Sequence, residues 1–259
     1  MEILCESLNI LRLRAEITPE MTDMVTNMNC FDTSRDADGD TLLHIAIISY
    51  QPGIAMSIIS KYRFTAYLSV QNNLFQSALH LSVLTNQVEV CRMLIEAGAE
   101  LESRDKDGNT ALLIACRDGL LPVVQCLLGS VRHFENSSST RNFNRKIQDL
   151  SIRNYLGYSN LHMAAMNGHL DIMALLIENG ADINITEGKT GRTILHNACA
   201  VGDIHLVKTL LRYKICDINA RAYDDYTPFD LARARGHDNV CTALAVAGAN
   251  QSNSYMDIE

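Results

Sequence analysis

The sequence predicts an all-α solenoid of six helix–turn–helix repeats with projecting hairpin fingers. A hydroxyl residue–x–leucine–histidine phrase returns along the chain, a turn residue follows it at a fixed distance, and a second amphipathic segment follows the turn. A period near 33 residues indicates a stack of similar supersecondary units. The hydroxyl residues are separated by 36, 33, 49, 34 and 34 positions, and they are Thr41, Ser77, Thr110, Ser159, Thr193 and Thr227.

Each first helix is expected to begin at its hydroxyl residue, whose oxygen can accept a hydrogen bond from a backbone N–H of the first turn. In the third and sixth repeats Leu113 and Asp230 replace the histidine, and Pro228 takes the first helical position that proline favours. We expect the imidazole rings of the histidines in the other four repeats to be partly buried and hydrogen-bonded to their own capping hydroxyl and to neighbouring backbone. A repeat apart, they cannot converge on one metal ion. They are His44, His80, His162 and His196.

Each first helix should end nine residues after its cap, at a residue that tolerates a left-handed backbone. In the first repeat Tyr50 breaks this pattern, whereas the other repeats have Asn86, Gly119, Gly168, Gly202 and Gly236. Amphipathic second helices follow, for example over 88–95 and 170–177. Hairpin tips are then expected two residues before the next cap, at Gly39, Gly108, Gly157 and Gly191.

Two parts depart from the repeat. The step of 49 residues contains an insertion at about 129–149, which is polar and without apolar periodicity and predicts a mobile surface loop between three N-terminal and three C-terminal repeats. A tolerated insertion and a contact role remain equally open. The last second helix, at 239–245, is short and rich in small residues, as in a terminal cap. We therefore divide the chain into an N-terminal amphipathic and acidic segment (1–35), a repeat domain (36–250) and a short tail (251–259).

Composition narrows the functional class. The eight cysteines form no C-x-x-C pair, which favours a reducing compartment over a disulfide framework or a zinc site. Neither a signal peptide nor a membrane span is expected, so we predict a cytosolic or nuclear protein. A phosphate loop is excluded because Ile183 stands where its first glycine belongs before 188–190. No other catalytic motif is present, so we expect a protein that is no enzyme and needs no cofactor or metal.

Charge and leucine spacing single out the N-terminal end. The net charge is −8, and residues 1–40 have nine acids against three arginines. This balance disfavours direct binding to nucleic acid and favours a basic protein segment as partner, although a solvated acidic arm would look the same. A nuclear export signal and an amphipathic helix packed on the first repeat would both explain the leucine spacing. The leucines are Leu4, Leu8, Leu11 and Leu13.

The repeated phrase at this period is typical of ankyrin repeats. Longer segments resemble the IκB family of NF-κB/Rel inhibitors, the Cactus type included. They are 38–48 in the first repeat, 72–87 in the second, 104–110 in the third and 191–193 in the fifth. Six repeats with an insertion after the third also match, so that the resemblance covers about 36–250.

The resemblance implies a non-enzymatic inhibitor in innate immune signalling. In the family, the first repeats bind the basic nuclear-localisation segment of a Rel subunit, and later repeats pack on the dimerisation domains. The localisation segment is then masked, DNA binding is blocked, and the dimer is retained in the cytoplasm. The resemblance also allows the inhibitor to shuttle through the nucleus. The acidic finger of the family corresponds to Asp38 and Asp40, whereas ordinary turn chemistry would also favour aspartate there. The relatives' export signal lies where the four leucines lie.

The alternatives are a nuclear co-regulator of the same family that acts on DNA-bound dimers, and a generic ankyrin adaptor with another protein partner. The chain has no Asp-Ser-Gly-x-x-Ser degron, no lysine before Lys61 and no long acidic tail after Asn250. These departures from the family predict either a truncated product or a constitutive, viral-type inhibitor. They also predict weaker displacement of DNA.

Overall fold

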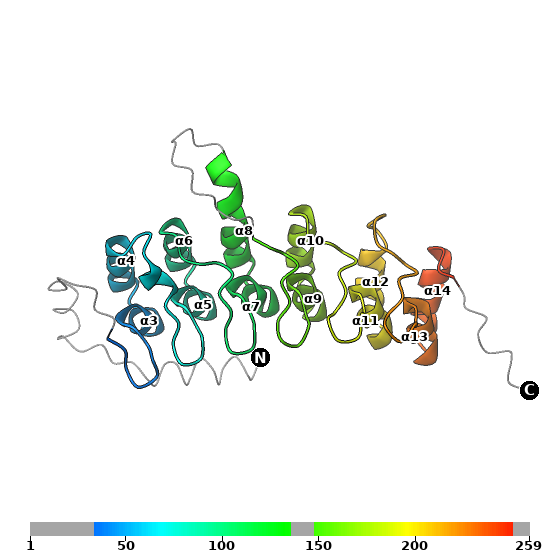
Figure 1. Ribbon diagram of the computed structural model, residues 1–259. Coiled ribbons are helices and arrows are strands. Elements are labelled where there is room, and N and C mark those ends of the chain that lie inside the picture. The colour runs from blue at the N-terminus through cyan, green and yellow to red at the C-terminus, as the bar shows by residue number, and fades with distance from the viewer. Residues whose placement is uncertain (1–33, 136–147, 251–259) are drawn as a thin grey trace, which may run out of the picture. The chain divides into compact units, whose positions relative to one another are not determined.

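The computed structural model describes residues 34–135 and 148–250, and every regular element within them is a helix (Figure 1). The chain divides into two compact units, 1–149 and 150–259. The helices of the first unit are α3 (Leu42–Ile48), α4 (Pro52–Lys61), the short 3-10 helix η1 (Ala66–Ser69), α5 (Ala78–Leu84), α6 (Val88–Glu96), α7 (Ala111–Asp118) and α8 (Leu121–Glu135). Those of the second unit are α9 (Asn160–Met166), α10 (Leu170–Glu178), α11 (Ile194–Val201), α12 (Ile204–Leu210), α13 (Pro228–Ala234) and α14 (Asp238–Val246).

Each unit stacks three antiparallel helix pairs. In the first unit the pairs are α3–α4, α5–α6 and α7–α8; first helices pack on first helices, and second helices on second helices. The interface between repeats is filled by aliphatic side chains such as Leu43, Ile47, Leu79 and Leu112, each at most 1% exposed. In the second unit the pairs are α9–α10, α11–α12 and α13–α14; α11 packs on α9 and α13, and α12 packs on α14. The predicted all-α ankyrin-repeat solenoid is confirmed.

All six predicted hydroxyl residues are helix N-caps with an extended backbone. Thr193 shows the complete pattern, because its hydroxyl accepts from the backbone N–H of His196 and its own N–H donates to the ring. In the sixth repeat Asp230 replaces the histidine in this role. Its Oδ2 accepts hydrogen bonds from the N–H and the hydroxyl of Thr227 at 3.1 and 2.7 Å. The degraded phrase therefore still closes a capping box.

The expected left-handed turn is present in every repeat, including the first. The five predicted turn residues have φ between 53° and 80°, and Tyr50 adopts φ 54° at the same place. The connection between the two helices of a repeat imposes this backbone whatever the residue. A tyrosine there is strained, since a side chain in the left-handed region costs about 1 kcal/mol or more.

Two expectations about helix length were wrong. Residues 129–135 belong to α8, which continues to Glu135, so the first part of the insertion is helical and not loop; residues 136–147 lie outside the described part. The last second helix is not short either, because α14 has nine residues, as α6 and α10 have. Its small side chains still bury less, since only Val240 and Leu244 of α14 are buried.

Candidate protein-binding surface

Three hairpin fingers, at 36–40, 71–76 and 104–109, precede α3, α5 and α7 in the first unit (Figure 1). In each, a side-chain oxygen five residues before the helix cap accepts hydrogen bonds from the backbone N–H groups two and four residues later. The six N–H···O distances lie between 2.8 and 3.0 Å, and the accepting residues are Asp36, Asn72 and Asp105. The side chain thereby replaces a backbone partner and sets the turn.

Neighbouring fingers are joined through their backbones. The N–H of Asn73 donates to the carbonyl of Asp38 at 3.0 Å, and the N–H of Lys106 donates to the carbonyl of Leu74 at 3.1 Å. The side chain of Gln71 adds a bond to the carbonyl of Arg104 at 2.8 Å. These bonds hold the three tips at a fixed spacing, so the finger tips form one preorganised surface.

The structure separates the two aspartates that the sequence singles out. Asp38 is half-buried at the tip of the first finger. Asp40 is only 8% exposed, its Oδ1 accepts from the amide of Asn72 at 2.8 Å, and it lies 3.8 Å from Nδ1 of His44. The carboxylate of Asp40 therefore ties the first finger to the second from inside the protein.

Sequence reasoning missed Asp36, which is exposed and shapes the first finger with the two bonds described above. The sequence contains a pattern that could have identified Asp36, because aspartate or asparagine stands five residues before the helix cap in four repeats. The residues are Asp36, Asn72, Asp105 and Asn154. In the fourth repeat Asn154 Oδ1 also accepts from the N–H groups two and four residues later, at 3.1 and 3.0 Å.

The second finger presents an apolar, strained tip. Leu74 and Phe75 are 39% and 58% exposed, and Phe75 has φ 57° where the first and third fingers have Gly39 and Gly108. A bulky residue in this backbone region is an outlier, and residues of this kind cluster at functional sites. The exposed aromatic ring is available to a partner.

We define the N-terminal finger surface as the exposed or half-buried carboxylates of the first and third fingers together with this apolar tip: Asp36, Asp38, Leu74, Phe75 and Asp107. Basic residues border it, and the guanidinium of Arg35 donates to the carbonyl of Gln71 at 3.1 Å. Most of the N-terminal acidic excess belongs to residues 1–33, outside the described part. The same holds for Leu4, Leu8, Leu11 and Leu13.

The repeated histidines have a structural role, as predicted. Ser159 Oγ and His162 Nδ1 are 2.8 Å apart, and Nε2 of His162 faces the carbonyl of Arg192 in the next repeat at 3.4 Å. His80 and His196 contact carbonyls of the following repeat in the same way, at 3.1 and 3.0 Å. Burial lowers the pKa of each of these rings. Neutral imidazoles therefore link successive repeats.

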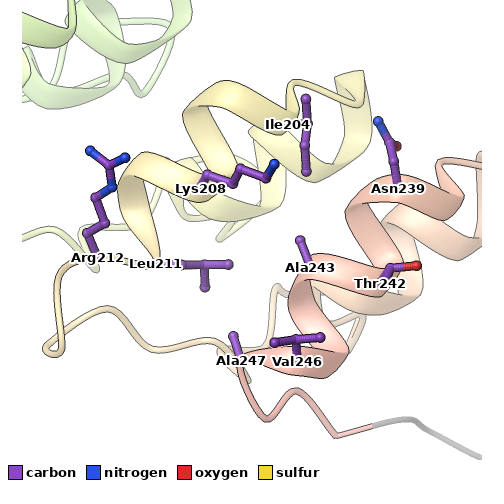
Figure 2. Close-up of a pocket in the computed structure, with 9 residues that line it drawn as sticks. All are labelled: Ile204, Lys208, Leu211, Arg212, Asn239, Thr242, Ala243, Val246 and Ala247. Carbon is purple, nitrogen blue, oxygen red and sulfur yellow. The ribbon is translucent and has the colours of Figure 1, made fainter.

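Two hollows mark the surface of the second unit. A groove of about 490 Å³ lies between α12 and α14, where Ile204, Leu211 and Val246 contribute apolar surface and Lys208 and Arg212 line the α12 side (Figure 2). A smaller hollow of about 290 Å³ lies between the fourth and fifth fingers, next to Leu156 and Arg192. The groove lining contains neither a carboxylate nor a thiol.

Within residues 34–135 and 148–250, no group of histidine, cysteine and carboxylate side chains has the arrangement of a metal site. None of the helices described there is long and apolar enough to span a bilayer.

Comparison with known proteins agrees with this architecture. The family described as "Ankyrin repeats (3 copies)" matches residues 17–105, 62–138, 79–187 and 161–254. The B-cell lymphoma 3 protein homolog of Mus musculus is 33% identical over 219 residues, which are 84% of this chain and 46% of that protein. The NF-kappa-B inhibitor alpha of Homo sapiens is 40% identical over 151 residues, which are 58% of this chain and 44% of that protein.

A solved structure is also similar. The crystal structure of the ankyrin repeat domain of Bcl-3, described as a unique member of the IκB protein family, has a TM-score of 0.73 and 31% identity to this chain. The match covers 83% of this chain and 89% of that domain. The chain spans less than half the length of the two curated relatives named above.

Proposed function

Because the chain belongs to the IκB family of ankyrin-repeat proteins, we propose that it is a non-enzymatic protein that binds an NF-κB/Rel dimer. The names of its relatives, which include NF-kappa-B inhibitors alpha and epsilon, support this partner. An ankyrin stack also offers an extended surface for a protein ligand. Direct binding to nucleic acid or to a membrane has no part in the proposal.

The proposed contact for the basic nuclear-localisation segment of a Rel subunit is the N-terminal finger surface. The single observation that carries this proposal is the strained, exposed Phe75, next to fingers that expose Asp36 and Asp107 and half-bury Asp38. Carboxylates steer a basic segment electrostatically and form charge-assisted hydrogen bonds with its lysine and arginine side chains. An aromatic ring packs on the aliphatic stems of the same lysine and arginine side chains. Asp40 acts from within, by holding the second finger through Asn72.

In this proposal the later repeats pack on the dimerisation domains, so that import is masked, DNA binding is blocked and the dimer stays in the cytoplasm. Leu4, Leu8, Leu11 and Leu13 would then export any complex that enters the nucleus. A second function, transcriptional co-regulation on DNA-bound dimers, is favoured by the similarity to the Bcl-3 domain over 83% of the chain. A generic adaptor with another partner is the remaining alternative.

The experiment is a competition assay with a purified Rel dimer on labelled κB-site DNA, with dimers that retain or lack their basic segment. We expect wild type to remove the dimer from DNA. A ternary complex that stays on DNA would favour the co-regulator. Failure to bind either dimer would contradict the partner assignment.

The finger surface is tested with Asp38→Asn plus Asp107→Asn, and separately with Phe75→Asn, since asparagine tolerates the left-handed backbone. Each variant should bind the dimer with its basic segment roughly tenfold more weakly at low salt, and the dimer without that segment as wild type does. The matched control is Glu96→Gln plus Glu178→Gln, which removes two exposed carboxylates from second helices. An equal loss for both dimers would contradict the finger assignment.

A further inference from the structure

Two cysteines on neighbouring second helices form a thiol pair that the proposed function does not use. Cys91 lies on α6 and Cys126 on α8, and these helices pack side by side at the edge of the first unit opposite its fingers (Figure 1). The thiol of Cys126 is within hydrogen-bonding reach of the Cys91 thiol and of the Arg92 guanidinium. Cys91 is fully buried, whereas Cys126 is half-buried. One sulfur of the pair is therefore accessible and the other is protected.

The surroundings polarise the pair. Hydrogen bonds from the Cys91 thiol and from Arg92 lower the pKa of Cys126 to about 7, although burial opposes the shift. Donation to Cys126, together with burial, raises the pKa of Cys91. The pKa of Cys241, which is also half-buried, is instead raised, chiefly by burial. At neutral pH, Cys126 is thus partly a thiolate beside a protonated thiol, which is the arrangement of reactive cysteines.

We propose that Cys126 is a hydroperoxide-sensitive modification site and that Cys91 is its resolving thiol. The Cys126 thiolate attacks one oxygen of hydrogen peroxide: an S–O bond forms, the O–O bond breaks, the sulfur is oxidised to sulfenic acid, and the leaving hydroxide is protonated by the buffer to water. Cys91 then attacks the oxidised sulfur. An S–S bond forms, the S–O bond breaks, and the oxygen leaves as water with the Cys91 proton.

The product would join α6 to α8 and close the segment 92–125, which contains the third finger. A cross-link of this kind stabilises a folded chain mainly by restricting its unfolded state. Oxidation would therefore stabilise the first unit against unfolding, and a dithiol would reverse the effect. The joined helices lie opposite the fingers, so the N-terminal finger surface stays open.

The first test treats the full chain with hydrogen peroxide, alkylates the remaining thiols under denaturing conditions and maps the peptides by mass spectrometry. We expect a linked Cys91–Cys126 peptide with a mass lower by about 2 Da than its two parts, for the two hydrogens lost. In Cys91→Ser, dimedone should instead trap a sulfenic acid on Cys126. Cys241→Ser, the matched control, should form the link as wild type does.

The second test begins with an alkylation measurement on chains that keep both cysteines, so this measurement does not depend on the folding of a cysteine variant. The rate of alkylation of Cys126 by iodoacetamide should rise with a midpoint near pH 7, and Arg92→Gln should move the midpoint upward. Peroxide should also raise the urea midpoint of wild type but not of Cys126→Ser. The proposal is overturned if Cys126 reacts no faster than Cys241 at neutral pH, or if peroxide yields no Cys91–Cys126 link.

Discussion

At the residue scale, the buried histidines make stability depend on pH. Burial lowers the pKa of His44 and of His162 from 6.5 to about 4, and it also lowers the pKa of His80 and His196. Between pH 6.5 and 4 the unfolded chain therefore binds more protons than the folded chain. The stabilisation is fully present above pH 6.5 and is lost as the pH falls toward 4.

For His162 alone, this loss amounts to about 2 kcal/mol between pH 7.5 and 5. We expect the urea-unfolding free energy of wild type to fall steeply over this range, and His162→Gln to reduce the fall by about that amount. His205→Gln, on the exposed side of α12, is the control and should keep the wild-type slope. Equal slopes in wild type and His162→Gln would show that carboxylates, and not this histidine, set the dependence.

Tyr50 is the clearest site of stored backbone strain. Its φ of 54° puts a bulky residue in the position that glycine holds in four other repeats. We expect Tyr50→Asn to raise the free energy of unfolding by up to about 1 kcal/mol, because asparagine tolerates this backbone. Denaturant unfolding measures the change, and Asn86→Ala is predicted to shift stability in the opposite direction. A loss of stability in Tyr50→Asn would mean that packing of the ring outweighs its strain.

At the element scale, one amide holds two fingers. Asn72 accepts from Leu74 and Gln76 through Oδ1 and donates to Asp40 through Nδ2. Asn72→Ala should lower the free energy of unfolding by about 2–3 kcal/mol, since it leaves the buried carboxylate without this donor. Asn72→Asp keeps the turn acceptor but sets two carboxylates together, and its loss should shrink on acidification. If both variants unfold as wild type does, the link between the fingers contributes little.

At the scale of the whole molecule, stability should decline toward α14. Only Val240 and Leu244 of α14 are buried, whereas α6 buries Val90, Cys91, Leu94 and Ile95. Repeats at the end of a one-dimensional stack open easily. Hydrogen exchange on the full chain should therefore be at least about tenfold faster for amides of α14 than for those of α6. Uniform protection would indicate that the repeats unfold as one cooperative body.

The sequence by itself determined the repeat, its caps, its turn residues and the hydrogen bonds between its histidines and their capping hydroxyls. These features follow from local rules: a hydroxyl accepts a first-turn N–H, glycine accepts a left-handed backbone, and residues a period apart take equivalent places. The same rules placed Asp38 and Asp40 together on one finger. By these rules Asp230 is an imperfect copy of the repeated histidine. In the structure, however, it completes the capping box of α13 with Thr227, as histidines do with the hydroxyl residues of their own repeats.

Only the tertiary structure decided which carboxylate faces inward. Asp40 is buried because Asn72, 32 residues later, comes within 2.8 Å of it, a contact that depends on how two repeats stack. The pairing of Cys91 with Cys126 depends on packing in the same way, because the two thiols come from α6 and α8 of neighbouring repeats. A periodic pattern specifies what one repeat is, but contacts between repeats determine which side chains remain for a partner.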